Sequence, residues 1–286
     1  MNNTYTFHKF SSLEPALELI CKQRETSKII AGGTDLLIEI RKEDKKLKGI
    51  HNIVDIHDIP VLREIRIEND ICTIGACCTH SEISRSDIIA NHFPVLKMAV
   101  DKIGSPQIRN VATIGGNICN LAACADSIAP LLIYDAKVRL CSLTKERIVP
   151  LVTILLKPYK TEVYKDEILT HILMPLPDKT WKYTFYKLGR RQGVSISRLS
   201  YAIMLKSENN TIQEIRLAFG ALFSVPKRLI ELERELNNQT ISEQLWKDTS
   251  RKVARQILDE TGVRWSTAYK LPALQQLLFT SLINLT

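Results

Sequence analysis

Over its first 56 residues, the chain alternates short apolar runs with apolar positions that repeat every three or four residues. The stretch after Ser12 places Leu13, Ala16, Leu17 and Ile20 on one side of a helix. Apolar runs on either side of this helix have the length of buried strands. The pattern predicts a β-α-β-α-β unit built on a small parallel sheet. Strands are expected at residues 5–7, 28–31 and 52–56, and a second helix at 36–41.

After residue 57, the pattern favours strands that pair with their neighbours along the chain. The polar residues Glu68, Asn69 and Asp70 separate two strand-like runs and predict a hairpin. One helix is expected to begin at Ser81, and the next to end at Gly104-Ser105-Pro106. Together these runs predict an antiparallel sheet with helices beside it. The expected strands are 64–67, 71–75, 137–140, 148–151 and 168–174, with a helix at 94–103.

The link Pro175-Leu176-Pro177-Asp178 is the best candidate for a domain boundary, because its prolines stiffen the backbone and interrupt regular structure. The residues after it predict three strands, with Asn209-Asn210 as a hairpin turn, followed by three helices. We therefore expect an α+β protein that ends in a three-stranded sheet with helices packed on it. The expected strands are 182–188, 200–205 and 212–219, and the expected helices are 227–236, 241–258 and 268–282.

Composition and charge argue against several classes of protein. The chain has 286 residues, of which 45% are hydrophobic and 24% charged, as in soluble globular proteins. The net charge of +8 comes from scattered basic residues; the cluster of Lys42, Lys45, Lys46 and Lys48 is interpreted as a solvated loop, so no nucleic-acid partner is expected. No apolar leader is visible, and no apolar run reaches the ~20 residues that span a membrane. Seven cysteines without a disulfide-like pattern complete the expectation of a cytoplasmic protein with free thiols.

Two glycine pairs, each after a β-type run, carry the strongest chemical signal. The first lies in I-I-A-G-G-T-D-L, which ends at Leu36, and the second in N-V-A-T-I-G-G-N, which begins at Asn110. Glycine pairs let a ligand approach the backbone closely, and their N–H groups can form an anion-binding concavity. Either pair alone is also consistent with an ordinary turn, and neither is a G-x-G-x-x-G dinucleotide fingerprint. Two such turns in one chain nevertheless favour one ligand with two phosphates, a dinucleotide.

The order A-G-G-T-D-L-L, then R-N-V-A-T-I-G-G-N-I-C-N, then A-D resembles the FAD-binding subunits of molybdenum hydroxylases, and among these the bacterial xanthine dehydrogenase type. The resemblance implies a FAD-binding domain of the vanillyl-alcohol-oxidase or PCMH type, followed by a domain like the C-terminal domain of CO dehydrogenase flavoproteins. We assign residues 1–176 to the first domain, with subdomains 1–56 and 57–176, and residues 177–286 to the second.

The resemblance also implies which residues bind FAD. Asp126 is an N-cap candidate for a following helix, and Lys187 could equally be an exposed strand lysine; the resemblance favours cofactor contacts for both. A Cβ at Gly115 or Gly116 is expected to occupy the approach of the pyrophosphate. The assigned residues are Ile29, Ile30, Ala31, Gly32, Gly33, Thr34, Asp35 and Leu36 from the first motif, Ala112, Thr113, Ile114, Gly115, Gly116 and Asn117 from the second, and Asp126, Ile168, Leu169 and Lys187.

The implied function is that of an oxidoreductase subunit that passes electrons from a small [2Fe-2S] subunit through FAD to NAD⁺, while a large molybdopterin subunit hydroxylates a purine such as xanthine. No catalytic acid or base and no metal ligand is assigned, because the histidines are dispersed and the cysteines are interpreted as small buried apolar residues. Two alternatives remain. One is a free-standing flavin oxidase or dehydrogenase of the same fold, and the other is a binding or assembly module without redox function.

Overall fold

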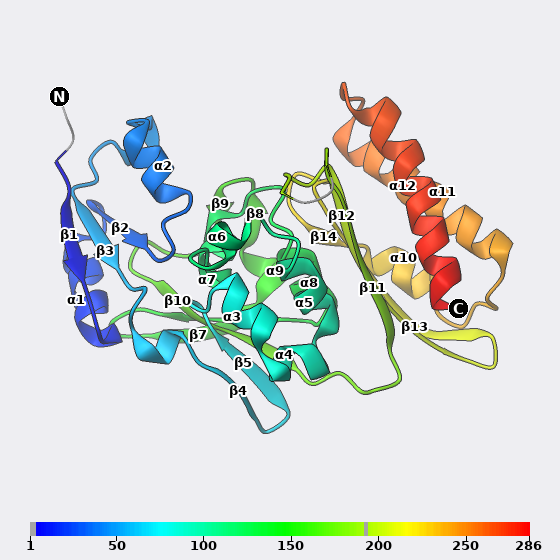
Figure 1. Ribbon diagram of the computed structural model, residues 1–286, viewed down its shortest axis with the longest axis horizontal. Coiled ribbons are helices and arrows are strands. Elements are labelled where there is room, and N and C mark those ends of the chain that lie inside the picture. Colours follow the sequence, from blue (N-terminus) through cyan, green and yellow to red (C-terminus); the bar gives the residue numbers. More distant parts are fainter. Residues whose placement is uncertain (1–3, 192–193) are drawn as a thin grey trace. The chain divides into compact units, whose positions relative to one another are not determined.

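The computed structural model describes residues 4–191 and 194–286, and their contacts divide into two compact units (Figure 1). The first unit consists of Met1–Ala122 and Asp135–Leu176, and the second of Ala123–Tyr134 and Pro177–Thr286. The chain therefore passes from one unit to the other three times. Residues 123–134 group with the second unit although they lie between two segments of the first.

The first unit begins with the expected parallel sheet, in the order β1-β3-β2. Helix α1 covers this sheet because Ala16, Leu17 and Ile20 are buried and pack in one cluster with Val54 of β3. The same cluster includes Ile168, so the core continues into the antiparallel part of the unit. The elements are β1 (Thr6–Lys9), α1 (Leu13–Gln23), β2 (Ser27–Ile30), α2 (Leu36–Arg41), η1 (Lys45–Leu47) and β3 (Asn52–Asp55).

The rest of the first unit contains a five-stranded sheet in the order β4-β5-β10-β6-β7, which confirms the expected antiparallel sheet. It also contains a two-stranded sheet of β8 and β9. The helix expected to start at Ser81 is instead capped by Thr79, which forms a capping box with Glu82. The elements are η2 (Pro60–Leu62), β4 (Ile65–Glu68), β5 (Ile71–Gly75), α3 (His80–Arg85), α4 (Asp87–His92), α5 (Pro94–Val100), α6 (Pro106–Arg109), α7 (Ile114–Asn120), β6 (Lys137–Cys141), β7 (Glu146–Pro150), α9 (Leu151–Ile154), β8 (Leu155–Lys157), β9 (Lys160–Thr161) and β10 (Ile168–Pro175).

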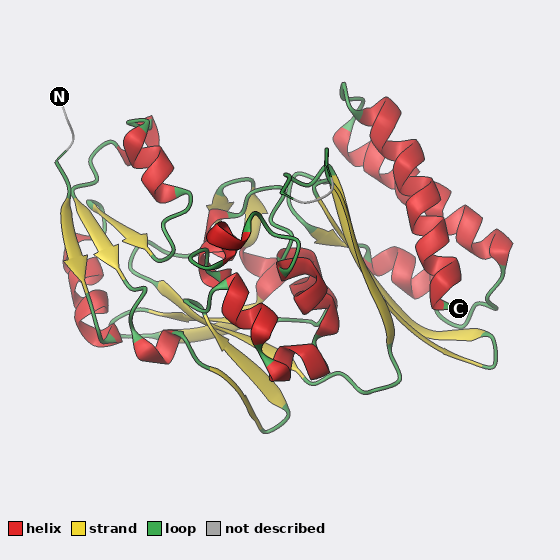
Figure 2. Ribbon diagram, viewed as in Figure 1, coloured by secondary structure: helices red, strands yellow, loops and turns green. Residues whose placement is uncertain are grey.

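The second unit is an antiparallel sheet in the order β11-β12-β13-β14, with helices on both faces (Figure 2). The short strand β14 adds a fourth strand to the three that were expected. Alternate residues of β12 pack against the C-terminal helices, while the intervening residues are also buried, and α8 contacts β12 and β13. The elements are α8 (Ile128–Ile133), β11 (Lys182–Leu188), β12 (Leu199–Glu208), β13 (Thr211–Gly220), β14 (Lys227–Arg228), α10 (Ile230–Leu236), α11 (Glu243–Thr261) and α12 (Thr267–Leu285).

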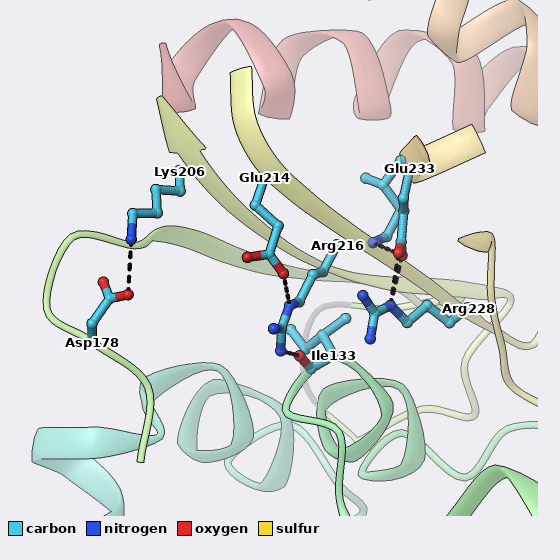
Figure 3. A network of polar contacts seen from close by, with 8 residues as sticks. Ile133, Asp178, Lys206, Glu214, Arg216, Arg228 and Glu233 are labelled. Atoms are coloured by element: carbon cyan, nitrogen blue, oxygen red, sulfur yellow. Dashed lines mark hydrogen bonds and ion pairs between the residues drawn. The ribbon is translucent and has the colours of Figure 1, made fainter. Parts of the chain in front are cut away.

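Helix α8 is attached to this sheet by polar as well as apolar contacts. All six of its residues are buried. At its C-terminal end, Arg216 of β13 donates a hydrogen bond from Nη1 to the carbonyl oxygen of Ile133, over 2.8 Å (Figure 3). The amide of Ala221 donates to the carbonyl oxygen of Ala123 at 2.9 Å, just before the helix. The segment 123–134 is therefore an integral layer of the second unit.

Candidate functional site

The first unit contains a cavity of about 570 Å³ lined by residues from its parallel sheet, its five-stranded sheet and the β8-β9 pair. Almost all of the residues assigned to the cofactor line it. Ile114, which is fully buried, is the one assigned residue of this unit that is not part of the lining. Asp126 and Lys187 belong to the second unit. The lining residues are Ile29, Ile30, Ala31, Gly32, Gly33, Thr34, Asp35, Leu36, Ala112, Thr113, Gly115, Gly116, Asn117, Ile168 and Leu169.

The turn after β2 presents a row of backbone N–H groups to this cavity. Within residues 4–191 and 194–286, the N–H groups of Gly32, Gly33, Thr34 and Asp35 donate no hydrogen bond to another part of the chain. The turn is held in shape by the amide of Leu37, which donates to the carbonyl oxygen of Gly33 at 3.1 Å. Consecutive N–H groups without protein acceptors form an anion-binding concavity. This turn can therefore hold a phosphate or pyrophosphate.

The side chains around this turn are also fixed. The Thr34 hydroxyl donates to Oδ2 of Asp35 at 3.2 Å, and Nδ2 of Asn120 donates to Oδ1 of Asp35 at 3.0 Å. Asn120 is the last residue of α7, so this contact joins the first glycine motif to the helix that contains the second. The two motifs thus form one continuous wall.

The second glycine motif differs from the expected strand and turn. Ile114, Gly115 and Gly116 form the first turn of helix α7, whose N-cap is Thr113. All four N–H groups from Ile114 to Asn117 are hydrogen-bonded within the chain. Their acceptors are the carbonyl oxygens of Cys78, Ala76 and Thr113 and the side-chain oxygen of Thr113. The second motif therefore contributes a packed surface to the cavity and no set of open N–H donors.

The glycines at two positions are required by neighbouring backbone. A Cβ on Gly32 would lie 1.9 Å from the carbonyl oxygen of Val111, and a Cβ on Gly115 would lie 2.6 Å from the Cβ of Ala76. The expectation that a Cβ on Gly115 would block the pyrophosphate is therefore wrong, because that position faces the protein. At Gly116 the nearest atom is the side-chain oxygen of Thr113, at 2.8 Å. Gly32 thus lets the first motif approach Val111 of the second motif closely, and Gly115 lets α7 pack against Ala76.

A further wall of the cavity is formed by the segment 158–167, which we term the strap. The sequence carried no motif that would have identified it. Its Glu167 is held by Arg147, whose Nε and Nη2 donate to the two carboxylate oxygens at 2.7 and 2.9 Å. The same guanidinium lies 4.6 Å from the ring centroid of Tyr164. Burial raises the pKa of Glu167, but hydrogen bonds from Arg147 and from the Tyr164 amide lower it by more. The pKa of Glu167 therefore lies below its usual range.

The strap also contacts residues from the parallel sheet region across the cavity. Lys165 forms an ion pair with Glu25, which follows α1. The ammonium of Lys46 lies 4.9 Å from the ring centroid of Tyr159. The basic cluster interpreted as a solvated loop is indeed exposed, yet Lys46 and Lys48 line the cavity. Lys46 is paired there with Glu39, another lining residue, at 3.7 Å, and Lys48 adds a positive charge to the lining.

Asp126 and Lys187 form a buried ion pair in the second unit. Nζ of Lys187 lies 2.8 Å from Oδ2 of Asp126, and both side chains are less than a tenth exposed. Ser197 donates a hydrogen bond to the other carboxylate oxygen at 2.5 Å. The alternative interpretations fail here, since the N-cap of α8 is Ser127 and the side chain of Lys187 is only 6% exposed. That the two residues bond to each other, with Ser197, could not be seen in the sequence because the three are distant along the chain.

Cysteines and histidines do not form a second centre among the described residues. No group of three or more His, Cys, Asp or Glu side chains there is arranged to hold a metal ion. Cys72, Cys77, Cys78 and Cys141 are buried as expected, but the interpretation was wrong for Cys21 and Cys119, which are exposed. Burial raises the pKa of the Cys72, Cys77 and Cys78 thiols to about 12. Those three thiols are therefore unreactive at neutral pH.

Comparison with protein families shows which family the chain belongs to. The family described as the FAD binding domain in molybdopterin dehydrogenase matches residues 3–177. The chain belongs to this family. The FAD-binding part is followed, at residues 184–285, by a match to the CO dehydrogenase flavoprotein C-terminal domain. The expected family, fold and cofactor are thus confirmed: the chain is a FAD-binding oxidoreductase subunit of the molybdenum hydroxylase family.

Individual relatives of this FAD-binding subunit cover almost its whole length. The xanthine dehydrogenase FAD-binding subunit of Escherichia coli is 33% identical over 94% of this chain and 92% of that protein. The glyceraldehyde dehydrogenase medium chain of Sulfolobus acidocaldarius is 28% identical over 93% of this chain and 92% of that protein. A carbon monoxide dehydrogenase chain from Hydrogenophaga pseudoflava superimposes with a TM-score of 0.89 at 23% identity, covering 98% of this chain and 96% of that chain.

The cavity suits FAD on its own geometry. The open N–H groups of Gly32–Asp35 match a pyrophosphate, which needs several converging donors. The buried side chains of Ile168 and Leu169 give the cavity an apolar wall, as a flavin or adenine ring requires.

Among the described residues, none of the helices has the length and apolar character needed to cross a bilayer.

Proposed function

We propose that this chain is the electron-transferring FAD subunit of a xanthine dehydrogenase-like complex, with NAD⁺ as the electron acceptor during purine hydroxylation. The observation that carries the proposal is the row of N–H groups without protein acceptors at Gly32–Asp35, in a cavity of a FAD-binding family member. The E. coli relative at 33% identity is named for xanthine dehydrogenase, which supports the choice of substrate class. A small [2Fe-2S] subunit and a large molybdopterin subunit are the proposed partners, in the cytoplasm.

The residues have distinct proposed roles. The N–H groups of Gly32, Gly33, Thr34 and Asp35 hold the pyrophosphate, the wall from Ala112 to Asn117 orients the cofactor, and Ile168 and Leu169 exclude water from one side of it. Asp126 and Lys187 are assigned to the same cofactor on the family resemblance alone. When bound, FAD supplies the exchange between single-electron iron–sulfur donors and a two-electron nicotinamide acceptor. No residue of this chain is assigned as a catalytic acid or base.

We also retain the proposed domains, residues 1–176 (subdomains 1–56 and 57–176) for FAD binding and residues 177–286 for the C-terminal domain. The matched families meet between residues 177 and 184, which supports this division. The contact units support it at residue 176, while adding 123–134 to the second unit.

The first test is an absorbance spectrum of the purified chain, with acid release and identification of the flavin. Absorbance bands at about 375 and 450 nm, with FAD released, are expected, since these bands belong to the oxidised cofactor. Riboflavin, which lacks the pyrophosphate, should bind at least about 100-fold more weakly than FAD because it leaves the Gly32–Asp35 donors unused. Equal affinities for riboflavin and FAD would contradict the proposed role of this turn.

The second test addresses the reaction. The chain is purified with its [2Fe-2S] and molybdopterin subunits, and reduction of NAD⁺ is followed at saturating xanthine. Xanthine-dependent NADH formation that stops when FAD is removed and returns when FAD is added supports the proposal. Reduction of the flavin by xanthine without NADH formation would exclude NAD⁺ as the acceptor, and no reduction at all would exclude the purine substrate.

A further inference from the structure

The second unit carries cations and an exposed aromatic side chain on the α11–α12 connection, at the start of α12 and just before β12. These elements can be followed in Figure 1. We term Arg198, Val263, Arg264, Trp265 and Lys270 the Arg–Trp patch. The guanidinium of Arg198 lies 5.1 Å from the ring centroid of Trp265. Trp265 is 83% exposed and Val263 85% exposed, which is far more than their apolar character favours. This patch belongs to no site described above.

The three cations of the patch lie near one another without acidic partners. Within residues 4–191 and 194–286, no carboxylate forms an ion pair with Arg198, Arg264 or Lys270. Burial lowers the pKa of Lys270, and the charges of Arg198 and Arg264 lower it further. Nζ of Lys270 donates a hydrogen bond to the carbonyl oxygen of Ala221 at 3.0 Å. Moving the ammonium away from the two arginines would break this bond. Like charges held together in this way favour an anionic partner.

Several other surface cations of the same unit are paired with carboxylates. Lys206 pairs with Asp178, Lys227 with Glu260, and Arg251 with Asp248. The patch differs from these pairs because, among the described residues, its three cations have no carboxylate partner and one of them, Arg198, lies against an exposed indole ring.

The shape of the patch favours a protein over a small molecule as its partner. Small-molecule sites are concave and cover most of their ligand. Trp265 and Val263 instead project from a connection between two helices and are more than four-fifths exposed. Tryptophan and arginine are the residues most enriched at the energetic centres of protein interfaces. Ile196, two residues before Arg198 in the sequence, is also 76% exposed.

We propose that the Arg–Trp patch is the docking surface for an acidic face of another subunit of the complex, with Trp265 as its central apolar contact. This inference rests on the proposed function, because it requires partner subunits. Carboxylates on the partner pair with the three cations and reduce the repulsion between the cations. The indole ring and Val263 are removed from water in the same interface. Assembly through this surface weakens as salt is added, since exposed charges are screened.

The test uses the FAD-loaded chain with its own [2Fe-2S] and molybdopterin subunits. The variants are Trp265→Ala and Arg264→Glu, and the matched control is Arg251→Glu, which makes the same charge change on α11 about 17 Å along the helix from Gly262. Dissociation constants are measured at several salt concentrations by mass photometry. FAD content and the urea midpoint are measured for every protein. Both variants should bind the partners at least tenfold more weakly, with FAD content and urea midpoint unchanged, and the control should bind as wild type does.

Three outcomes would overturn the proposal, and they can be told apart. If wild type, both variants and the control assemble equally, the docking surface is elsewhere while the proposed function stands. If assembly is unchanged but the KM for NAD⁺ rises in Arg264→Glu, the patch binds the phosphates of the acceptor instead of a protein. If wild type itself fails to assemble with either subunit, the proposed function fails and the docking proposal fails with it.

Discussion

Gly115 and Gly116 are adjacent in the sequence but meet different surroundings, and this difference is testable. A Cβ at Gly115 would lie 2.6 Å from the Cβ and 2.7 Å from the carbonyl oxygen of Ala76, and backbone cannot easily give way. A Cβ at Gly116 meets only the Thr113 side-chain oxygen, and alanine favours the helix by about 1 kcal/mol. Gly115→Ala should therefore lower the free energy of unfolding by about 1–3 kcal/mol in urea titrations. Gly116→Ala should be nearly neutral, and equal losses at both positions would contradict the packing.

His80 should make stability depend on pH. It is fully buried, neither ring nitrogen has a hydrogen-bond partner among the described residues, and burial lowers its pKa from 6.5 to about 4. Because the unfolded imidazole takes up a proton first, the free energy of unfolding is highest above pH 6.5 and falls as the pH approaches 4. The loss from this group is up to about 3 kcal/mol. In urea titrations at pH 7 and pH 4.5, His80→Leu should be close to wild type at pH 7 and lose less on acidification. The same pH dependence in both proteins would contradict this assignment.

For single residues, the sequence predicted which ones line the cavity better than it predicted what each of them contacts. The ordered motifs named most of the residues that surround the cavity, because a glycine pair next to a strand is a local feature. The partners of those residues are not local. Gly32 meets Val111, Gly115 meets Ala76 and Asp126 meets Lys187, and no periodicity in one segment indicates which remote backbone or side chain it will approach.

The strap is the element whose contacts bear most directly on cofactor release. Arg147 lies outside the cavity lining, but its two hydrogen bonds hold Glu167 at the end of the strap. Arg147→Gln should free the strap and increase the dissociation rate of FAD by about tenfold, because charge-assisted bonds of this kind contribute about 1.5–3 kcal/mol. The measurement is the recovery of flavin fluorescence after dilution.

Arg139→Gln is the matched control, since Arg139 pairs with the half-exposed Glu146 on the same sheet and also lies outside the cavity lining. This variant should release FAD at the wild-type rate. If Arg147→Gln and Arg139→Gln release FAD equally fast, the strap does not retain the cofactor.

Among the elements, the strands and long helices were predicted well because their apolar periodicity is strong. The short elements were not. The run from Val111 to Ile114 has β-type residues but leads into α7, since Thr113 caps a helix there through the amide of Gly116. The two-residue strand β14 is too short to show a period at all. Tertiary contacts decide such segments, and local propensity is a weak guide to them.

At the scale of the whole molecule, the pair formed by Asp126 and Lys187 ties the inserted segment 123–134 to the second unit. Breaking a buried ion pair leaves one charge without a partner and costs about 3–5 kcal/mol. Lys187→Met should therefore lower the free energy of unfolding by that amount in urea titrations. The double variant Asp126→Asn with Lys187→Met should be less destabilised than Lys187→Met alone, because no buried charge remains.

Lys206→Met provides the comparison, because its partner Asp178 is half exposed and such pairs contribute about 0–1 kcal/mol. A loss for Lys187→Met no larger than for Lys206→Met would show that the pair does not hold the segment.

The three crossings of the chain between the units also have a consequence for synthesis on the ribosome. Helix α8 is made early, yet the strands β12 and β13 that bury it are completed only when Gly220 has been added. At a translation rate of about 5–20 residues per second, the strands that bury the six residues of α8 are completed on the order of ten seconds after the helix itself. During that interval the nascent chain carries an apolar helix whose partner strands have not yet been made. Slow translation or scarce chaperones should therefore affect this protein at one identifiable stage of its elongation.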